Sequence, residues 1–433
     1  MTFEALRGFR DYLPPEAGAR SELRRRMRAA ARRCGFVELE TPSVESLELY
    51  QTKSGEEISE QLWAFTDKGG RQVALAAETT PSLARVLAER AKSEPMPVKW
   101  FTVSRLWRYE EPQAGRTREF TQFNLDILGV EGPEAEVEVL AAAALALDDA
   151  GASGLYAFRI NDRYLAEGLG RRFGTTDPAA FFRALDRLRK VPPEVTAAAL
   201  EAAGVPAASQ GELLELLASS GEGVRPAEAP AFLDRLAALN LPAPGPAGLE
   251  RLRTIMELVG PAGLGDRVRL DLGVVRGLAY YTGAVFEAFD LAGAHRSLFG
   301  GGRYDRLIEL FGGPPTPACG LAIGDQTLEI LLKEHGRWPS GEPGLDTFFV
   351  AVSPEDRPFA LEWVQRLRRA GRSADLDLLG RSMSRQLREA ARRGARRAVL
   401  VGPRERSRGV VVERDLATGA QREIPPEELL AGG

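Results

Sequence analysis

Residues 107–129 read WRYEEPQAGRTREFTQFNLDILG. The chain from Trp100 to Glu110 alternates between apolar and polar side chains, which is typical of a strand with one buried face. PQAGRTRE interrupts this alternation with Pro and Gly, and FTQFNLDILGV resumes it. Two alternating runs joined by a polar loop predict neighbouring strands of an antiparallel sheet.

The surrounding segments add helices and further strands to this pair. A helix is expected over 20–33, a strand in FVELETP, a hairpin with a Gly-Gly turn over 62–78, and a helix over 81–91. Strands in pairs with helices beside them indicate an α+β fold, with helices packed on an antiparallel sheet.

The rest of the chain divides by composition. Residues 1–160 and 261–335 are expected to form one α+β domain in two parts, and 161–260, rich in Ala, Leu and Glu, a helical insertion. Residues 345–433 alternate strand and helix patterns, which predicts a small βαβαβ domain with a parallel sheet. VVRGLAYYTGAVFEAF (274–289) reads as strand with Arg276 inside it, and the glycines after Phe299 read as a turn.

Composition narrows the class of protein. The chain has 433 residues, two cysteines, two histidines and a net charge of −4. The segment 345–433 holds 17 Arg, no Lys and 13 acidic residues, a balance of +4, which leaves −8 for the other 344 residues. This suits a cytoplasmic protein without disulfides, zinc site or membrane span, and a C-terminal domain able to face phosphates. A solvated helix face is an equally simple interpretation of its arginines.

Several polar side chains occupy positions where a sheet needs none. Gln122 and Asp126 are four residues apart, so both point to one face of a strand. The others are Glu78, Arg108, Glu110, Arg276, Tyr281 and Tyr304. Carboxylates hold an ammonium group, arginines hold phosphates and phenols orient a ring. Any one of them could be a surface ion pair, and it is their joint occurrence that indicates a site.

The motifs resemble those of the histidyl-tRNA synthetases, a class II aminoacyl-tRNA synthetase family, in their archaeal and eukaryotic style. GFVELETPSVE resembles motif 1, and residues 107–129 resemble motif 2. VVRGLAYYTGAVFEAF and GGGRYDRLIELFGGPPTPACGLAIG resemble two histidine-specific signatures, and GRSMSRQLREAARRGARRAVLVG an anticodon-binding domain. The resemblance covers nearly the whole chain and is weakest over the helical insertion.

The resemblance implies a reaction and a role for each matching residue. It implies that histidine and ATP, with Mg²⁺, form an acyl-adenylate, and that the acyl group passes to the 3′ end of tRNA(His). Arg276 and Arg108 match catalytic arginines. Arg108, Glu110 and Arg116 match residues that bind ATP. Those that match histidine-binding positions are Glu78, Thr80, Gln122, Asp126, Tyr281, Gly302 and Tyr304. A homodimer in the cytoplasm is also implied, with no metal held by side chains alone.

Some positions depart from the family pattern. Ala279 stands where relatives have Asp, Ala76 and Ala77 replace Arg-Pro before Glu78, and Thr327 replaces an arginine of motif 3. Two alternatives therefore stay open beside the ligase. One is a non-catalytic paralogue, such as the regulatory subunit of ATP phosphoribosyltransferase. The other is an enzyme that passes activated histidine to an acceptor other than tRNA.

Overall fold

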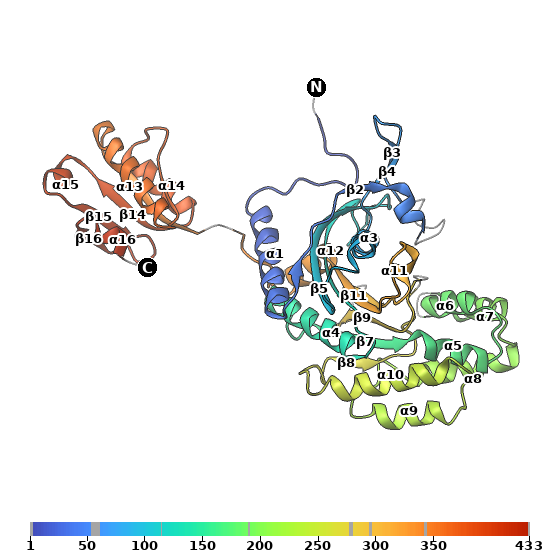
Figure 1. Ribbon diagram of the computed structural model, residues 1–433. Helices are drawn as coiled ribbons and strands as arrows, with labels where there is room; N and C mark the ends of the chain where they lie inside the picture. Colours follow the sequence, from blue (N-terminus) through green and yellow to red (C-terminus); the bar gives the residue numbers. More distant parts are fainter. Residues whose placement is uncertain are drawn as a thin grey trace. The chain divides into compact units, whose positions relative to one another are not determined.

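The computed structural model describes residues 3–52, 61–113, 115–188, 191–276, 280–293, 297–341 and 344–431. Two compact units make up the chain (Figure 1). The first spans Met1–Asp11 and Glu22–Pro339, and the second spans Tyr12–Ser21 and Ser340–Gly433. Ala279 and His295 lie outside the described residues.

An eight-stranded sheet forms the centre of the first unit. In spatial order its strands are β1 (Val37–Glu38), β5 (Val98–Trp107), β6 (Glu119–Leu128), β11 (Ala318–Gly324), β10 (Phe299–Arg303), β9 (Ala284–Asp290), β7 (Tyr156–Asp162) and β8 (Val268–Leu270). Neighbouring strands are antiparallel except at the two edges, where β1 pairs with β5 and β8 with β7 in parallel. The predicted antiparallel sheet is therefore confirmed.

Helices cover one face of this sheet. They are α1 (Glu16–Arg33), α4 (Glu134–Leu147) and α12 (Asp325–Glu334). Phe123, Leu125 and Ile127 of β6 point into this core. The alternate side chains of β6 therefore point to the opposite face, as the period of two requires.

Smaller elements complete the first unit. A second sheet contains β2 (Val44–Ser46), β4 (Gln72–Leu75) and β3 (Ala64–Thr66), the last two forming the predicted hairpin. The helices are α3 (Thr80–Arg90), α5 (Arg163–Arg172), α6 (Pro178–Arg187), α7 (Pro193–Ala202), α8 (Ala207–Ala218), α9 (Ala229–Ala237), α10 (Gly245–Leu258) and α11 (Leu307–Leu310), with a π-helical turn η1 (Asp148–Ala152). Helices α5 to α10 gather beside β7 and β8 in Figure 1, so the insertion is helical as expected.

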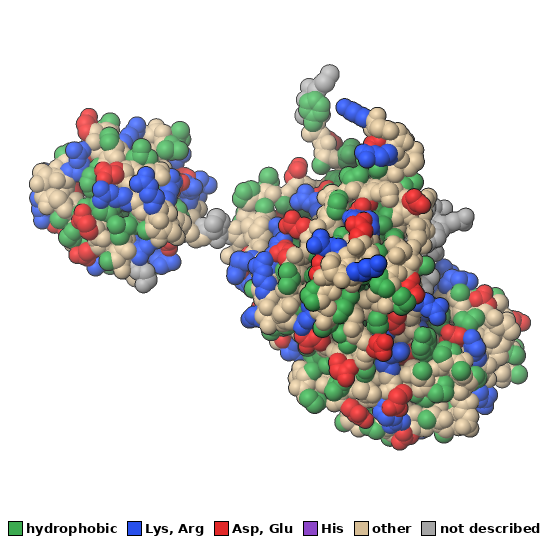
Figure 2. All heavy atoms as spheres, in the orientation of Figure 1, with side chains coloured by type: hydrophobic (Ala, Val, Ile, Leu, Met, Phe, Trp, Pro, Cys, Tyr) green, Lys and Arg blue, Asp and Glu red, His purple; other side chains and the backbone are tan. Residues whose placement is uncertain are grey.

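The second unit has a five-stranded sheet in the order β13-β12-β14-β15-β16. Its elements are β12 (Leu345–Ala351), η2 (Pro354–Asp356), α13 (Arg357–Arg369), β13 (Ala374–Leu376), α14 (Met383–Arg392), β14 (Ala395–Val401), α15 (Pro403–Ser407), β15 (Val411–Asp415), β16 (Gln421–Ile424) and α16 (Glu428–Ala431). β13, β12 and β14 are parallel, as predicted, and β15 and β16 extend them antiparallel. Figure 2 shows many arginine side chains on the visible face of this unit, with acidic ones between them.

Two sequence interpretations were wrong. The glycines after Phe299 form the central strand β10 rather than a turn. Arg276 lies outside the strands, between β8 and β9, with a positive φ of 50°. Alternation could not reveal either feature, because the first depends on small residues buried between strands and the second on a left-handed backbone.

Among the described residues no helix is both long and apolar enough to cross a membrane.

Candidate active site

A cavity of about 360 Å³ opens on the face of the central sheet opposite the helical core. It is lined by Gln61, Ala77, Glu78, Thr80, Arg108, Gln122, Asn124, Asp126, Arg276, Tyr280, Tyr281, Gly300, Tyr304, Gly320, Leu321 and Ala322. Residues from three central strands, β6, β10 and β11, and from the segment before β9 thus meet in one place. We call it the first cavity.

Small residues on β10 and β11 make room for the charged side chains. A side chain added at Gly320 would overlap the Asp126 carboxylate, and one added at Gly300 would overlap the Arg276 guanidinium. Ala322 pairs with Asn124 across the two strands. Gly300 and Gly320 therefore need to be glycine because of the charged groups beside them, and not because of a turn.

The β6 side of the first cavity presents Gln122, Asn124 and Asp126 at every second position. The Tyr304 hydroxyl donates a hydrogen bond to the Asp126 carboxylate. Both side chains are 2% exposed. Burial, and then the neighbouring Asp126 charge, raise the pKa of Tyr304 well above its ordinary value. The phenol therefore stays protonated and remains a donor at neutral pH.

Three tyrosine rings pack together at the same end of the first cavity. The ring centroids of Tyr280 and Tyr281 are 4.6 Å apart, and those of Tyr280 and Tyr304 are 6.1 Å apart. Burial raises the pKa of Tyr280 and of Tyr281. Gly302 lies under the Tyr281 ring, where a side chain would overlap it, and does not itself line the cavity. The rings form a wall suited to a flat ligand group.

Arg276 also lines the first cavity, and its charge acts on the neighbouring Tyr281. Its Nη1 donates to Glu287 Oε1 of β9 at 2.7 Å, and its side chain is 22% exposed. Burial by itself would lower the pKa of Arg276, but the neighbouring Tyr281 and Glu287 outweigh it and raise the pKa. The guanidinium is therefore a fixed positive charge at the edge of the cavity.

A second cavity of about 190 Å³ adjoins the first and shares Arg108 and Gln122 with it. It is lined by Arg108, Glu110, Gly115, Arg116, Thr117, Phe120, Gln122, Ser297, Leu298, Gly324, Gln326 and Thr327. The two cavities meet at the ends of β5 and β6, where the polar loop predicted from the sequence begins. We call this one the second cavity.

Contacts within the loop orient the charges of the second cavity. Arg108 Nε donates to the Ala77 carbonyl at 3.0 Å, and its guanidinium lies 5.3 Å from the centre of the Phe120 ring. Glu110 pairs with Arg116 at 3.1 Å. An aromatic face beside two arginines suits a base attached to phosphates.

Glu78 and Thr80 reach the first cavity from the start of α3. Glu78 is 7% exposed. Every residue predicted for the site thus lines one of the two cavities, except Gly302. Sequence reasoning had not assigned Asn124, Gly300 and Glu287. The spacing of Asn124 from Gln122 and Asp126 was a usable signal, whereas nothing local indicated Glu287.

Asn124 is 2% exposed, and its buried Oδ1 has no hydrogen-bond partner among the residues that the structure describes. A buried amide oxygen without a partner is costly, so a bound group that supplies a donor would stabilise it. The described residues contain no group of three or more His, Cys, Asp or Glu side chains placed to hold a metal ion.

Comparisons with known proteins agree with this geometry. The profile of the family "Histidyl-tRNA synthetase" matches residues 8–328, and that of "Anticodon binding domain" matches 346–432. The histidine–tRNA ligase of Natronomonas pharaonis is 39% identical over 98% of this chain and 98% of its own length. That of Opitutus terrae is 38% identical over 99% and 98%, respectively.

Solved structures share the fold. The histidyl-tRNA synthetase of Nostoc sp. PCC 7120 matches with a TM-score of 0.84 at 25% identity, over 100% of this chain and 98% of its own. A Bacillus halodurans protein, described as an ATP phosphoribosyltransferase regulatory subunit/histidyl-tRNA synthetase, matches at 0.72 and 23% identity, over 87% and 93%. With its two cavities, its signatures and these full-length matches, the chain belongs to the histidyl-tRNA synthetase family.

Proposed function

We propose that this member of the family is a histidine–tRNA ligase, with histidine bound in the first cavity and ATP in the second. One observation carries the proposal. Arg108 and Gln122 line both cavities, so a carboxylate in the first and a phosphate in the second would meet between them. Joining two substrates requires such a shared boundary.

The histidine end of the first cavity is formed by Asp126 and the tyrosines. Tyr304 already donates to Asp126, so the remaining lone pairs of this carboxylate can accept from an imidazole N–H. Tyr281 lies along the wall where the ring would stack. Glu78, Thr80 and Gln122 would hold the α-ammonium group, because a carboxylate and neutral oxygens favour a cation.

The first step transfers an adenylyl group. A histidine carboxylate oxygen attacks the α-phosphorus of ATP, the new C–O–P linkage forms, and pyrophosphate leaves with the electrons of the broken P–O bond. Negative charge gathers on the α-phosphate oxygens during this attack. Arg108 and Arg276 would stabilise it from two sides, and fixed charges aimed at developing charge lower the barrier most.

The nucleotide would occupy the second cavity with its base against Phe120 and its phosphates toward Arg108 and Arg116. Mg²⁺ commonly binds through one or two carboxylates and the phosphates of a nucleotide. Glu110 is a carboxylate of this cavity, which fits that mode of binding. The ion would neutralise phosphate charge. In the second step a ribose hydroxyl oxygen of the 3′-terminal adenosine of tRNA(His) attacks the acyl carbon and its proton is released. AMP leaves with the electrons of the broken acyl C–O bond.

The regulatory-subunit alternative is less well supported. The Bacillus halodurans structure shares the fold at 23% identity, which says nothing of activity. The match of residues 346–432 to an anticodon-binding domain favours a tRNA substrate. We further propose a cytoplasmic homodimer, as the resemblance implies.

Histidine-dependent exchange of pyrophosphate into ATP tests the proposal directly. The intact chain should catalyse exchange with Mg²⁺ present, and should charge tRNA(His) with labelled histidine. Histidine binding without exchange at any Mg²⁺ concentration would refute the ligase and favour the regulatory paralogue. Exchange without charging would favour an acceptor other than tRNA.

A further inference from the structure

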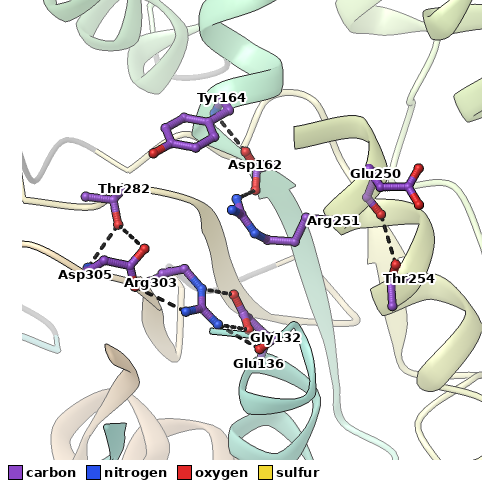
Figure 3. Close-up of polar contacts among 10 residues, drawn as sticks. All are labelled: Gly132, Glu136, Asp162, Tyr164, Glu250, Arg251, Thr254, Thr282, Arg303 and Asp305. Atoms are coloured by element: carbon purple, nitrogen blue, oxygen red, sulfur yellow. Dashed lines mark hydrogen bonds and ion pairs between the residues drawn. The ribbon is translucent and has the colours of Figure 1, made fainter. Parts of the chain in front are cut away.

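Arg303 is one of the largest fully buried side chains among the described residues, at 1% exposed, and none of the chemistry above uses it. Its Nε and Nη2 donate to the two carboxylate oxygens of Glu136 in α4, each at 2.7 Å. Glu136 is fully buried. Nη1 also donates to the Val130 carbonyl at 3.0 Å. Nη2 also donates to the Gly132 carbonyl at 2.9 Å, and Figure 3 shows its contacts with Gly132 and Glu136.

A buried ion pair of this kind is a poor source of stability, because desolvation of the two charges offsets most of their attraction. What the ion pair provides instead is a fixed geometry between the two side chains. Two parallel hydrogen bonds between a guanidinium and a carboxylate fix both distance and orientation. The end of β10 is thereby held at a set position against α4, on the sheet face opposite the first cavity.

From Arg303 the contacts continue to the segment before β9, which contains Tyr281 and Thr282. Arg303 Nη1 donates to Asp305 Oδ1 at 3.2 Å, and the Thr282 hydroxyl donates to Asp305 Oδ2 at 3.1 Å. The Asp305 N–H donates back to Thr282 Oγ1 at 3.0 Å, and the Thr282 N–H to the Arg303 carbonyl at 2.8 Å. Figure 3 shows Thr282, Asp305 and Arg303 joined in this way. We call these three residues the clamp.

The clamp lies next in the chain to two of the three tyrosines of the first cavity. Tyr304 lies between Arg303 and Asp305 in the chain, and Tyr281 directly precedes Thr282. Fixing the backbone on either side of Tyr304, and next to Tyr281, sets where both rings stand. The Tyr304 ring is thereby held in one position, from which its hydroxyl donates to Asp126.

We propose that Arg303, Asp305 and Thr282, anchored by Glu136, are positioning residues that hold Tyr281 and Tyr304 in the arrangement that binds the imidazole of histidine. This rests on the proposed function for the identity of the ligand. In the contacts above, the clamp touches no residue of the second cavity. Its loss should therefore raise KM for histidine and leave KM for ATP unchanged.

Thr282→Val tests the clamp with little change in volume, since it removes the hydroxyl that joins Asp305. Loss of such a hydrogen bond should raise KM for histidine about tenfold. KM for ATP and kcat should change less than about twofold. Thr282→Ser retains the hydroxyl and should restore the wild-type KM. Arg303→Lys, which retains charge without the bidentate geometry, should act in the direction of Thr282→Val if it folds.

Arg267→Met is a matched control. Arg267 pairs with Asp148 at 2.7 Å and with the Tyr156 hydroxyl at 2.9 Å. Tyr156 pairs with Asp290, at the opposite end of β7 and β9 from Thr282. The control variant should lower the melting temperature without separating the two KM values. A parallel rise in both KM values for Thr282→Val, or the same separation in Arg267→Met, would overturn the proposal.

Nitration by tetranitromethane gives a readout that needs no ligand. Tyr281 and Tyr304 are 7% and 2% exposed, so both should react slowly in the wild type. Mass spectrometry should find faster nitration of both in Thr282→Val and not in Thr282→Ser. Unchanged nitration in Thr282→Val would overturn the clamp. Absence of pyrophosphate exchange in the wild type would refute the proposed function instead, and nitration would still decide on the clamp.

Discussion

Replacement of Arg276 by alanine should reduce histidine-dependent pyrophosphate exchange far more than it reduces histidine binding. The Arg276 side chain is 22% exposed and its Nη1 pairs with Glu287 Oε1 at 2.7 Å, so its other N–H groups can donate to the reacting groups. Two unit charges about 4 Å apart interact by about 4 kcal/mol at the effective dielectric of a partly buried site. Only the share of this energy that arises in the transition state affects kcat.

Loss of one preorganised donor of this kind typically lowers kcat by about a hundred- to a thousandfold. We therefore expect exchange by Arg276→Ala to fall by that factor, with the calorimetric Kd for histidine changed less than about tenfold. Exchange is measured at saturating histidine and ATP, so that kcat and not KM sets the rate.

Glu287→Gln is the matched control for this variant. It removes the charge of the partner and leaves Arg276 in place. If Arg276 acts on the substrates, Glu287→Gln should lose much less activity than Arg276→Ala. Equal losses in the two variants, or more than a tenth of wild-type exchange in Arg276→Ala, would refute the electrostatic role and make the pair a structural one.

Four further outcomes can be measured. Asn124→Ala removes the buried amide whose Oδ1 has no partner among the described residues, and calorimetry should find histidine binding about tenfold weaker. Burial raises the pKa of Tyr280, Tyr281 and Tyr304 in the folded state. The free energy of unfolding should therefore fall as pH rises above about 10, where the tyrosines of the unfolded chain ionise. Denaturant titrations should show a smaller fall in this free energy for Tyr304→Phe. Deletion from Leu345 onward should weaken tRNA binding strongly at matched salt and leave histidine binding nearly unchanged; equal tRNA affinity would contradict the assignment. Light scattering at micromolar concentration should give the mass of a dimer, and a monomer mass would contradict the expected assembly.

The sequence predicted those parts of the site that follow a strand period. Gln122 and Asp126 were assigned to one face because they are four residues apart, and the structure brings both to the first cavity. The same period includes Asn124, so its spacing was a usable signal, although spacing does not reveal whether the amide has a partner. Its unpartnered oxygen is a property of packing, which becomes visible only in three dimensions.

Features that depend on space left empty could not be predicted. Glycine usually weakens a strand, so the run after Phe299 was interpreted as a turn. In the structure Gly300 accommodates the Arg276 guanidinium, and Gly320 accommodates the Asp126 carboxylate. The positive φ of Arg276 could not be predicted either, because it leaves no pattern in the sequence. The Arg276 side chain contacts Glu287, eleven residues later.

The charges that line the two cavities predict a large effect for Arg276, because Thr327 stands where the family has a motif 3 arginine. Among the described residues, the cavity walls contain three arginines, Arg108, Arg116 and Arg276, and three carboxylates, Glu78, Glu110 and Asp126. The balance is zero, because Thr327 supplies no charge on the α12 side. A polyanionic nucleotide therefore meets no excess of positive charge from the protein, and removal of Arg276 alone makes the balance negative. Since repulsion then acts on the phosphates as they gain charge, the effect of Arg276→Ala should lie toward the upper end of the expected range.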